Sequence, residues 1–123
     1  MNKVLIGIAI GVLLGLCCSY AINSFSSTES ISSDFARVTI KNESGRNAKK
    51  ILLQHEKGTI EAAGLMDKEE IRFIFKNASE NSYKIIVTFD NDSTLTSSPV
   101  YIEHGYRGTE TIKELEIKTE ANW

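Results

Sequence analysis

The sequence predicts an all-β fold, a compact antiparallel immunoglobulin-like sandwich of about seven strands preceded by an N-terminal hydrophobic helix. From residue 36 onward, β-branched and aromatic residues recur with a period of two, as in half-buried strands. Turn-forming residues interrupt this pattern roughly every eight to twelve residues. The residues expected in the core include neither cysteine nor tryptophan. An antiparallel barrel is the alternative that the same pattern allows.

The clearest predicted strand covers residues 83–89 (YKIIVTF), where every second side chain is Tyr, Ile, Val or Phe. Residues 91–94 (NDST) then predict a hairpin turn, so the strand that begins at Leu95 is expected to be its antiparallel neighbour. The same period predicts further strands at residues 36–41, 50–55, 59–63 and 71–76.

Two segments in the second half of the chain are less regular. Pro99 lacks a backbone N–H, which favours an edge position or a bulge before the apolar residues Val100 and Ile102. The charged loop at residues 66–70 has room for one helical turn.

The last periodic segment, residues 109–117, fits two kinds of secondary structure. Leu115 and Ile117 suit a strand, whereas the spacing of Ile112 and Leu115 suits a short helix. We predict a strand.

The composition divides the chain into four parts. Residues 1–22 are a signal peptide or a single transmembrane anchor, and residues 23–35 are a serine-rich linker. The β-sandwich domain is expected at residues 36–118, followed by a C-terminal tail at residues 119–123.

The N-terminal segment from Val4 to Ile22 carries no charge, and as a helix it would be about 28 Å long, enough to span a bilayer. Lys3 is the flanking cation on its N-terminal side, which predicts that the N-terminus lies in the cytoplasm and the domain outside it. A cleaved signal peptide is one interpretation, because Ser19 and Ala21 are small residues that would place cleavage before Ile22.

A retained anchor is the second interpretation. Gly7, Gly11, Gly15 and Ser19 recur every four residues, a stripe of small side chains that would allow two such helices to form a homodimer. Glycine is also simply frequent in membrane segments. Lipidation of Cys17 or Cys18 is a third interpretation. It fits poorly, because bacterial lipoprotein signals have a small residue directly before the lipidated cysteine, whereas Leu16 precedes Cys17.

Charge and cysteine content exclude several classes of function. Lys3 is the only charged residue before Asn23, so the rest of the chain carries a net charge of about −3 and forms no dense basic stripe. We therefore expect no nucleic-acid partner. Both cysteines, Cys17 and Cys18, lie in the hydrophobic segment, so the domain has no disulfide framework, which suits a bacterial envelope.

Four short strings carry a resemblance that covers roughly residues 38 to 112. They are VTIKNESG, ILLQHEKGTIEAAGL, SYKIIVTFDND and YIEHGYRGTETI. With these strings the chain resembles small uncharacterised bacterial exported or membrane-anchored proteins that have no established activity. The resemblance implies a β-sandwich outside the cytoplasm and implies no activity.

Two acid–histidine pairs are the candidate metal ligands, His55 with Glu56 and Glu103 with His104. Imidazole and carboxylate together can bind a divalent metal ion if the strand ends that carry them meet. The alternative is that all four are exposed residues at the edges of loops, because their spacing matches no ligand motif.

The preferred contact surface is the glycine-flanked loop that contains Tyr106 and Arg107, with Tyr101 and His104 nearby. Tyrosine and arginine are enriched where proteins bind one another. The alternative is that Tyr106 folds back to cover the end of the sandwich.

No catalytic residue is assigned, because the sequence contains no nucleophile–base motif, phosphate-binding glycine loop or paired carboxylate motif. We expect no cofactor. The favoured function is a non-enzymatic cell-envelope protein that displays or releases a small β-sandwich for protein–protein interaction, with an unknown partner in the envelope. The alternatives are a small-ligand or metal-binding module and an inhibitor or immunity protein against an exported enzyme.

Overall fold

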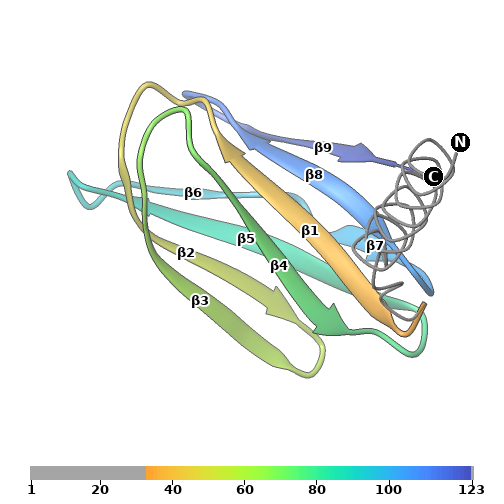
Figure 1. Cartoon of the computed structure of the whole chain (residues 1–123). Helices are drawn as coiled ribbons and strands as arrows, with labels where there is room; N and C mark the ends of the chain where they lie inside the picture. The colour runs from red at the N-terminus through yellow and green to blue at the C-terminus, as the bar shows by residue number, and fades with distance from the viewer. Residues whose placement is uncertain (1–32, 123) are drawn as a thin grey trace, which may run out of the picture. The chain divides into compact units, whose positions relative to one another are not determined.

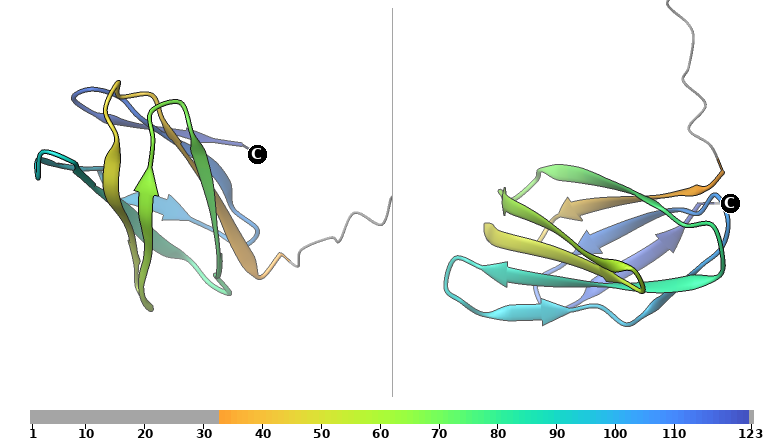
Figure 2. Two further views of the ribbon diagram at one scale, coloured as in Figure 1. Left: turned by 60° about the vertical axis from the view of Figure 1, so that its left-hand side comes forward. Right: turned by 90° about the horizontal axis from the view of Figure 1, so that it is seen from below.

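Two β-sheets packed face to face make up the fold of residues 33–122, the part of the chain that the computed structural model describes. Sheet A has the strand order β4 (Glu70–Lys76), β1 (Phe35–Asn42), β8 (Arg107–Ile112) and β9 (Ile117–Ala121). Sheet B has the order β3 (Gly58–Leu65), β2 (Ala48–His55) and β5 (Asn81–Phe89), and the short strands β6 (Thr94–Thr96) and β7 (Val100–Ile102) both pair with the far side of β5. Figure 1 shows the strands of each sheet side by side, and Figure 2 shows the two layers from other directions.

The core forms where the apolar faces of the two sheets meet, which confirms the all-β sandwich. In β1, Ala36, Val38 and Ile40 are buried while the residues between them point outward. A valine or isoleucine side chain such as Val38 or Ile40 contributes about 1.5 to 3 kcal/mol to folding when it leaves water. The same alternation buries every second residue of β5, namely Tyr83, Ile85, Val87 and Phe89. The period of two therefore predicted which residues form the core.

The expectation of a purely antiparallel sandwich is corrected by one pair of strands. β1 and β8 are hydrogen-bonded in parallel, with Val38 opposite Gly108 and Ile40 opposite Glu110. Parallel neighbours need a long connection between them, and here the whole of sheet B separates the two strands in the sequence. A hydrophobic period of two is the same in parallel and antiparallel strands, so it could not distinguish them.

The single strand predicted at residues 109–117 is also corrected. The structure has two antiparallel strands there, β8 and β9, in which Ile112 faces Ile117 across a turn. Leu115 lies in this turn and is 84% exposed. β1 begins at Phe35 and β9 reaches Ala121, so the strands extend beyond the predicted boundaries at residues 36 and 118.

Pro99 lies between β6 and β7, where it interrupts what would otherwise be one strand along the edge of sheet B. This is the edge position that its missing N–H predicted. The predicted hairpin turn is confirmed, because β5 and β6 are antiparallel and Thr88 faces Thr94. The loop at residues 66–70 contains a turn in which Lys68 has a positive φ of 71°, and it contains no helix.

The predictions for the N-terminus lie outside the described residues. They comprise the hydrophobic helix at residues 1–22, its cleavage, lipidation or packing through Gly7, Gly11, Gly15 and Ser19, and most of the serine-rich linker. Within residues 33–122, no helix is long and apolar enough to cross a membrane.

Gly108 occupies a position in β8 where a side chain has no room. A Cβ atom built on Gly108 would lie 2.7 Å from Cε1 and Cζ of Tyr106, and closer still to the Tyr106 hydroxyl. Tyr106 and Gly108 are two residues apart, so they share the inner face of the sheet, and the tyrosine ring covers the glycine. Burial of Tyr106 therefore depends on glycine at position 108.

Replacing Gly108 with alanine should lower the free energy of unfolding by about 1 to 3 kcal/mol, because the new methyl group must displace the Tyr106 ring in a packed core. Urea unfolding followed by fluorescence measures this loss. In a Tyr106→Ala background the same Gly108→Ala change should cost much less, because the ring that it displaces is gone. Equal costs in the two backgrounds would show that the ring is not the obstacle.

Candidate functional site

The four residues of the predicted contact surface lie on different faces of the sandwich. Tyr101 is 54% exposed on β7, opposite Ser82, and so faces outward from sheet B. Arg107 is exposed at the start of β8 on the outer face of sheet A. The two side chains therefore belong to opposite surfaces, and the structure does not gather them into one patch.

Tyr106 is buried between the sheets, with only 4% of its surface exposed. Its ring meets that of Tyr83 edge to face, with the ring centres 6.0 Å apart. The alternative interpretation, in which this tyrosine folds back over the end of the sandwich, describes its position. His104 remains at the surface, where its Nε2 lies 3.0 Å from Oδ1 of Asp34.

The two acid–histidine pairs do not meet. His55 ends β2, which pairs with one side of β5, whereas Glu103 and His104 follow β7, which pairs with the other side. Two strand spacings of about 4.8 Å therefore separate the backbones that carry them. Among residues 33–122, no group of three or more histidine, cysteine or acidic side chains is placed to hold a metal ion.

His55 packs against the core. Its ring stacks on that of Phe75 with the centres 4.7 Å apart, and this joins the end of β2 to β4 in the other sheet. Burial, with a smaller contribution from Lys57, lowers the pKa of His55. A neutral imidazole suits a position against an aromatic ring.

A buried polar cluster that the sequence analysis missed lies between the sheets. The Tyr83 hydroxyl donates to Oε1 of Glu110 at 2.5 Å, and the Thr119 hydroxyl donates to Oε2 at 2.9 Å. The hydroxyls of Tyr83 and Tyr106 lie 3.5 Å apart. Glu110 has no exposed surface. One signal was available in the sequence, because Glu110 stands between Gly108 and Ile112 on the inward phase of its strand.

Burial shifts the ionisation of this cluster. It raises the pKa of Glu110, against the opposing effect of the hydrogen bonds from Tyr83 and Thr119. Burial, and then the hydrogen bond to Glu110, raise the pKa of Tyr83. A shifted carboxyl is typical of catalytic sites, but the Glu110 side chain has no surface exposed to solvent. The hydrogen bond from Tyr83 to Glu110 joins β5 to β8.

The free edges of the sheets differ in how well they are protected against pairing with another chain. β4 carries Glu70, Arg72 and Lys76, and β9 carries Lys118 and Glu120. The third edge consists of two three-residue strands interrupted by proline. Charges, short length and proline are the usual means by which proteins block an edge.

β3 is the least protected edge in the described part of the chain. It is eight residues long, it pairs with β2 alone, and Glu61 is its only charged residue. Residues 62–64 (AAG) are small, so their side chains give little steric cover to the backbone. The strand therefore presents an open row of backbone hydrogen-bonding groups.

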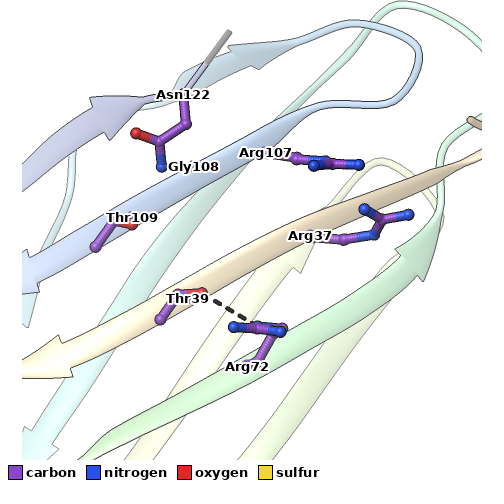
Figure 3. A pocket seen from close by; sticks show the side chains of 7 residues that line it. All are labelled: Arg37, Thr39, Arg72, Arg107, Gly108, Thr109 and Asn122. Carbon is purple, nitrogen blue, oxygen red and sulfur yellow. Dashed lines mark hydrogen bonds between the residues drawn. The ribbon is translucent and has the colours of Figure 1, made fainter. Parts of the chain in front are cut away.

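A shallow depression lies on the outer face of sheet A (Figure 3). Its volume is about 330 Å³, and the side chains of three arginines surround it, Arg37 from β1, Arg72 from β4 and Arg107 from β8. Arg107 thus belongs to a surface feature, although a different one from the loop that the sequence predicted.

Comparison with known proteins identifies the fold and no family. No protein-family model and no curated protein matches the chain. A protein from Eubacterium rectale, solved by NMR, has a similar structure with a TM-score of 0.58 and 12% identity, over 72% of this chain and 88% of that one. At this identity the likeness shows the fold alone.

Two further solved structures match with a TM-score of 0.41 each. They are listeriolysin O, at 7% identity over 72% of this chain and 22% of that one, and a disulfide-locked mutant of intermedilysin with human CD59, at 8% over 72% and 24%. The chain spans less than a quarter of either protein, and likenesses this weak carry no argument about function.

We predict that the folded state becomes less stable as the pH rises, because of Glu110. Its folded-state pKa lies above the ordinary value of 4.5, so the contribution of Glu110 to stability is complete below that pH and is lost as the pH rises through the folded-state pKa. The glutamine side chain of the Glu110→Gln variant cannot ionise, so the variant should not lose stability in this way. Urea unfolding between about pH 4 and about pH 8 should therefore show the unchanged protein losing stability relative to the variant.

The matched control is Glu120→Gln, which removes an exposed carboxyl from the adjacent strand. A stability difference between the unchanged protein and Glu110→Gln that stays constant across this pH range would contradict the assignment.

Proposed function

We propose that this chain is a non-enzymatic cell-envelope protein whose β-sandwich binds another protein outside the cytoplasm, by accepting an extended segment of that protein as an additional strand beside β3. The observation that carries the proposal is the open eight-residue edge of β3, which has a single charge while the other edges are blocked.

The register of the hairpin indicates which groups of β3 would make the contact. His55 and Gly58 close a two-residue turn, so they are expected to form the last hydrogen-bonded pair between β2 and β3. Alternation along an antiparallel ladder then directs the backbone groups of Thr59, Glu61 and Ala63 away from β2. Glu61 would favour a partner segment that is uncharged or carries one basic residue opposite it.

The sequence of the N-terminal segment supports the location. An uncharged run long enough to span a bilayer, with Lys3 before it, favours an anchor or export signal that leaves the domain outside the cytoplasm. The resemblance to exported or anchored bacterial proteins agrees with it. The protein would then be a single-pass inner-membrane protein, or a periplasmic or secreted one if the segment is cleaved.

The immunoglobulin-like class is supported at the level of architecture by the two facing sheets. The strand order is less favourable, because β1 pairs with β4 and β8 whereas the first two strands of constant-type immunoglobulin domains share a sheet. The class therefore describes the layers and not the connections.

The alternative functions differ in their support. A metal-binding role for His55, Glu56, Glu103 and His104 is not favoured, because the two pairs lie on opposite sides of β5. An inhibitor or immunity protein against an exported enzyme is a form of the main proposal in which the partner is that enzyme. Strand addition would serve either kind of partner.

Site-specific photo-crosslinking in the envelope of a bacterial host tests the contact. A crosslinking amino acid at position 63, on β3, should give one adduct with a different protein, and the same probe at Thr94, on the opposite edge of sheet B, should not. Glu61→Pro removes an outward N–H and should reduce the adduct by roughly tenfold. Glu61→Gln keeps that donor and should retain it.

Three outcomes would contradict the proposal. They are equal crosslinking at both positions, an adduct that Glu61→Pro leaves unchanged, and an adduct with twice the mass of this chain, which would identify a second copy as the occupant.

Fractionation and intact mass test the location separately. We expect either the full-length chain in the membrane fraction or a chain that begins at Ile22 in the soluble envelope fraction. Full-length protein free in the cytoplasm would refute an envelope location and would leave the β3 contact to be judged by crosslinking alone.

A further inference from the structure

The outer face of sheet A is basic although the chain as a whole carries a net charge of −2. The cations that point outward from three adjacent strands are Arg72 and Lys76 on β4, Arg37 and Lys41 on β1, and Arg107 on β8. The one acidic residue on the same face of these strands is Glu70, and its carboxylate lies 4.0 Å from Nζ of Lys41. Glu120 on β9, opposite Thr109, is a further acid on the outer face of sheet A, so the cations on this face outnumber the acids but do not stand alone.

The strand register places the three arginines together. Arg37 lies directly opposite Arg107 in the parallel pair β1–β8. Arg72 lies opposite Thr39, two residues along β1 from Arg37, and is therefore its diagonal neighbour on the other side. Arg72 and Arg107 therefore lie on either side of β1 on the same face of the sheet, with Arg37 between them.

The depression between the arginines offers further donors and no acid. Its other polar side chains are two hydroxyls and an amide, those of Thr39, Thr109 and Asn122. Nε of Arg72 lies 3.4 Å from Oγ1 of Thr39, a contact that directs the guanidinium along the sheet toward β1 (Figure 3). None of the ion pairs formed among residues 33–122 involves Arg72 or Arg107.

Arg46 shows how differently a structural arginine is held in this chain. Its guanidinium lies 3.8 Å from the centre of the Phe89 ring, and it donates to the Ser93 hydroxyl and to the carbonyl oxygen of Glu114. The Arg46 side chain therefore links its own loop to the loops that contain Ser93 and Glu114. Arg72 and Arg107 instead are exposed side chains on the flat face of a sheet.

We infer that this depression is a binding site for a tetrahedral oxyanion, a phosphate or sulfate group. Arginine presents parallel N–H donors that match the oxygens of such a group. Arg72 and Arg107 form no ion pair within residues 33–122, and a tetrahedral dianion has enough oxygens to accept from both. The depression of about 330 Å³ also has room for a small organic group attached to the anion.

Thermal unfolding of the full chain in a neutral detergent tests the site with inorganic phosphate as the probe. Phosphate should raise the melting temperature in a saturable manner, because a ligand that binds only the folded state stabilises it. Acetate at the same ionic strength should have little effect. Equal responses to phosphate and acetate would overturn the inference, because they would reflect general screening.

Variants localise the effect. Arg72→Gln and Arg107→Gln should each weaken phosphate binding by about tenfold or more, and Arg72→Lys, which keeps the charge but loses the fork of donors, should weaken it nearly as much. Lys84→Gln is the control, because it removes one charge from an exposed position on β5 in the other sheet. Equal weakening by Lys84→Gln and the arginine variants would overturn the inference.

The source of the phosphate group is distinguished by flotation of the chain with vesicles of phosphatidylcholine that contain phosphatidic acid. Binding that requires Arg72 and Arg107 would support the site with a lipid headgroup as its ligand, and binding of inorganic phosphate alone would support it with a soluble one. If neither probe depends on the two arginines, the site does not exist. These results are independent of the β3 crosslink, because β3 belongs to the edge of sheet B.

Discussion

The hydrogen bond between Tyr83 and Glu110 is the constraint on which the arrangement of the two sheets depends. It joins an inner strand of sheet B to an inner strand of sheet A, at a distance of 2.5 Å and with both side chains buried. A buried carboxyl group without partners destabilises a protein by several kcal/mol, of the order of 3 to 5 when a buried pair is broken. A shift of β8 by one residue would turn Glu110 to the outer face and Arg107 to the interior, so this bond also fixes the register.

The outer face of sheet A follows from the same register. With Glu110 pointing inward, Arg107 and Thr109 must point outward, because successive residues of a strand face opposite sides. The parallel pairing with β1 then sets Arg37 beside Arg107. The polar cluster inside the sandwich and the basic depression outside it are therefore two consequences of one strand alignment.

The period of two was sufficient to predict the core residues and most strands, but it carries no information on which strands are neighbours. The parallel pair β1–β8 joins residues that are about seventy positions apart, and only packing decides such a pairing. The split between β8 and β9 was missed because no glycine or proline marks the turn around Leu115.

The two acid–histidine pairs and the tyrosine loop illustrate the same limit for sites. Their residues look chemically promising as types, yet His55 and Glu103 lie across β5 from one another and Tyr106 turns inward over Gly108. Conversely, the sequence analysis did not single out Arg37 or Arg72, and it assigned Arg107 to the tyrosine loop and not to this face. Their proximity appears only when the register of three strands is known.

Some turns are held mainly by hydrogen bonds between residues that are close in the sequence. In the turn from Asn42 to Gly45 after β1, the Asn42 side chain accepts from both the backbone N–H and the hydroxyl of Ser44. Its Nδ2 also donates to the carbonyl oxygens of Arg46 and Leu65, and the second of these ties the end of β1 to the end of β3 in the other sheet. Such a motif describes how the chain turns, which is why it indicates a fold and not an activity.

The proposed surfaces place different demands on a partner, and this bears on how they could act together. Strand addition at β3 depends on backbone hydrogen bonds, which are short-ranged and largely independent of salt. The arginine depression acts through charge, which extends over about 10 Å and weakens as salt is added. A negatively charged surface would attract the basic face of sheet A and repel the rest of this acidic chain, so it would orient the sandwich before any close contact forms. Because β3 lies at the edge of the other sheet, its backbone would remain accessible in that orientation.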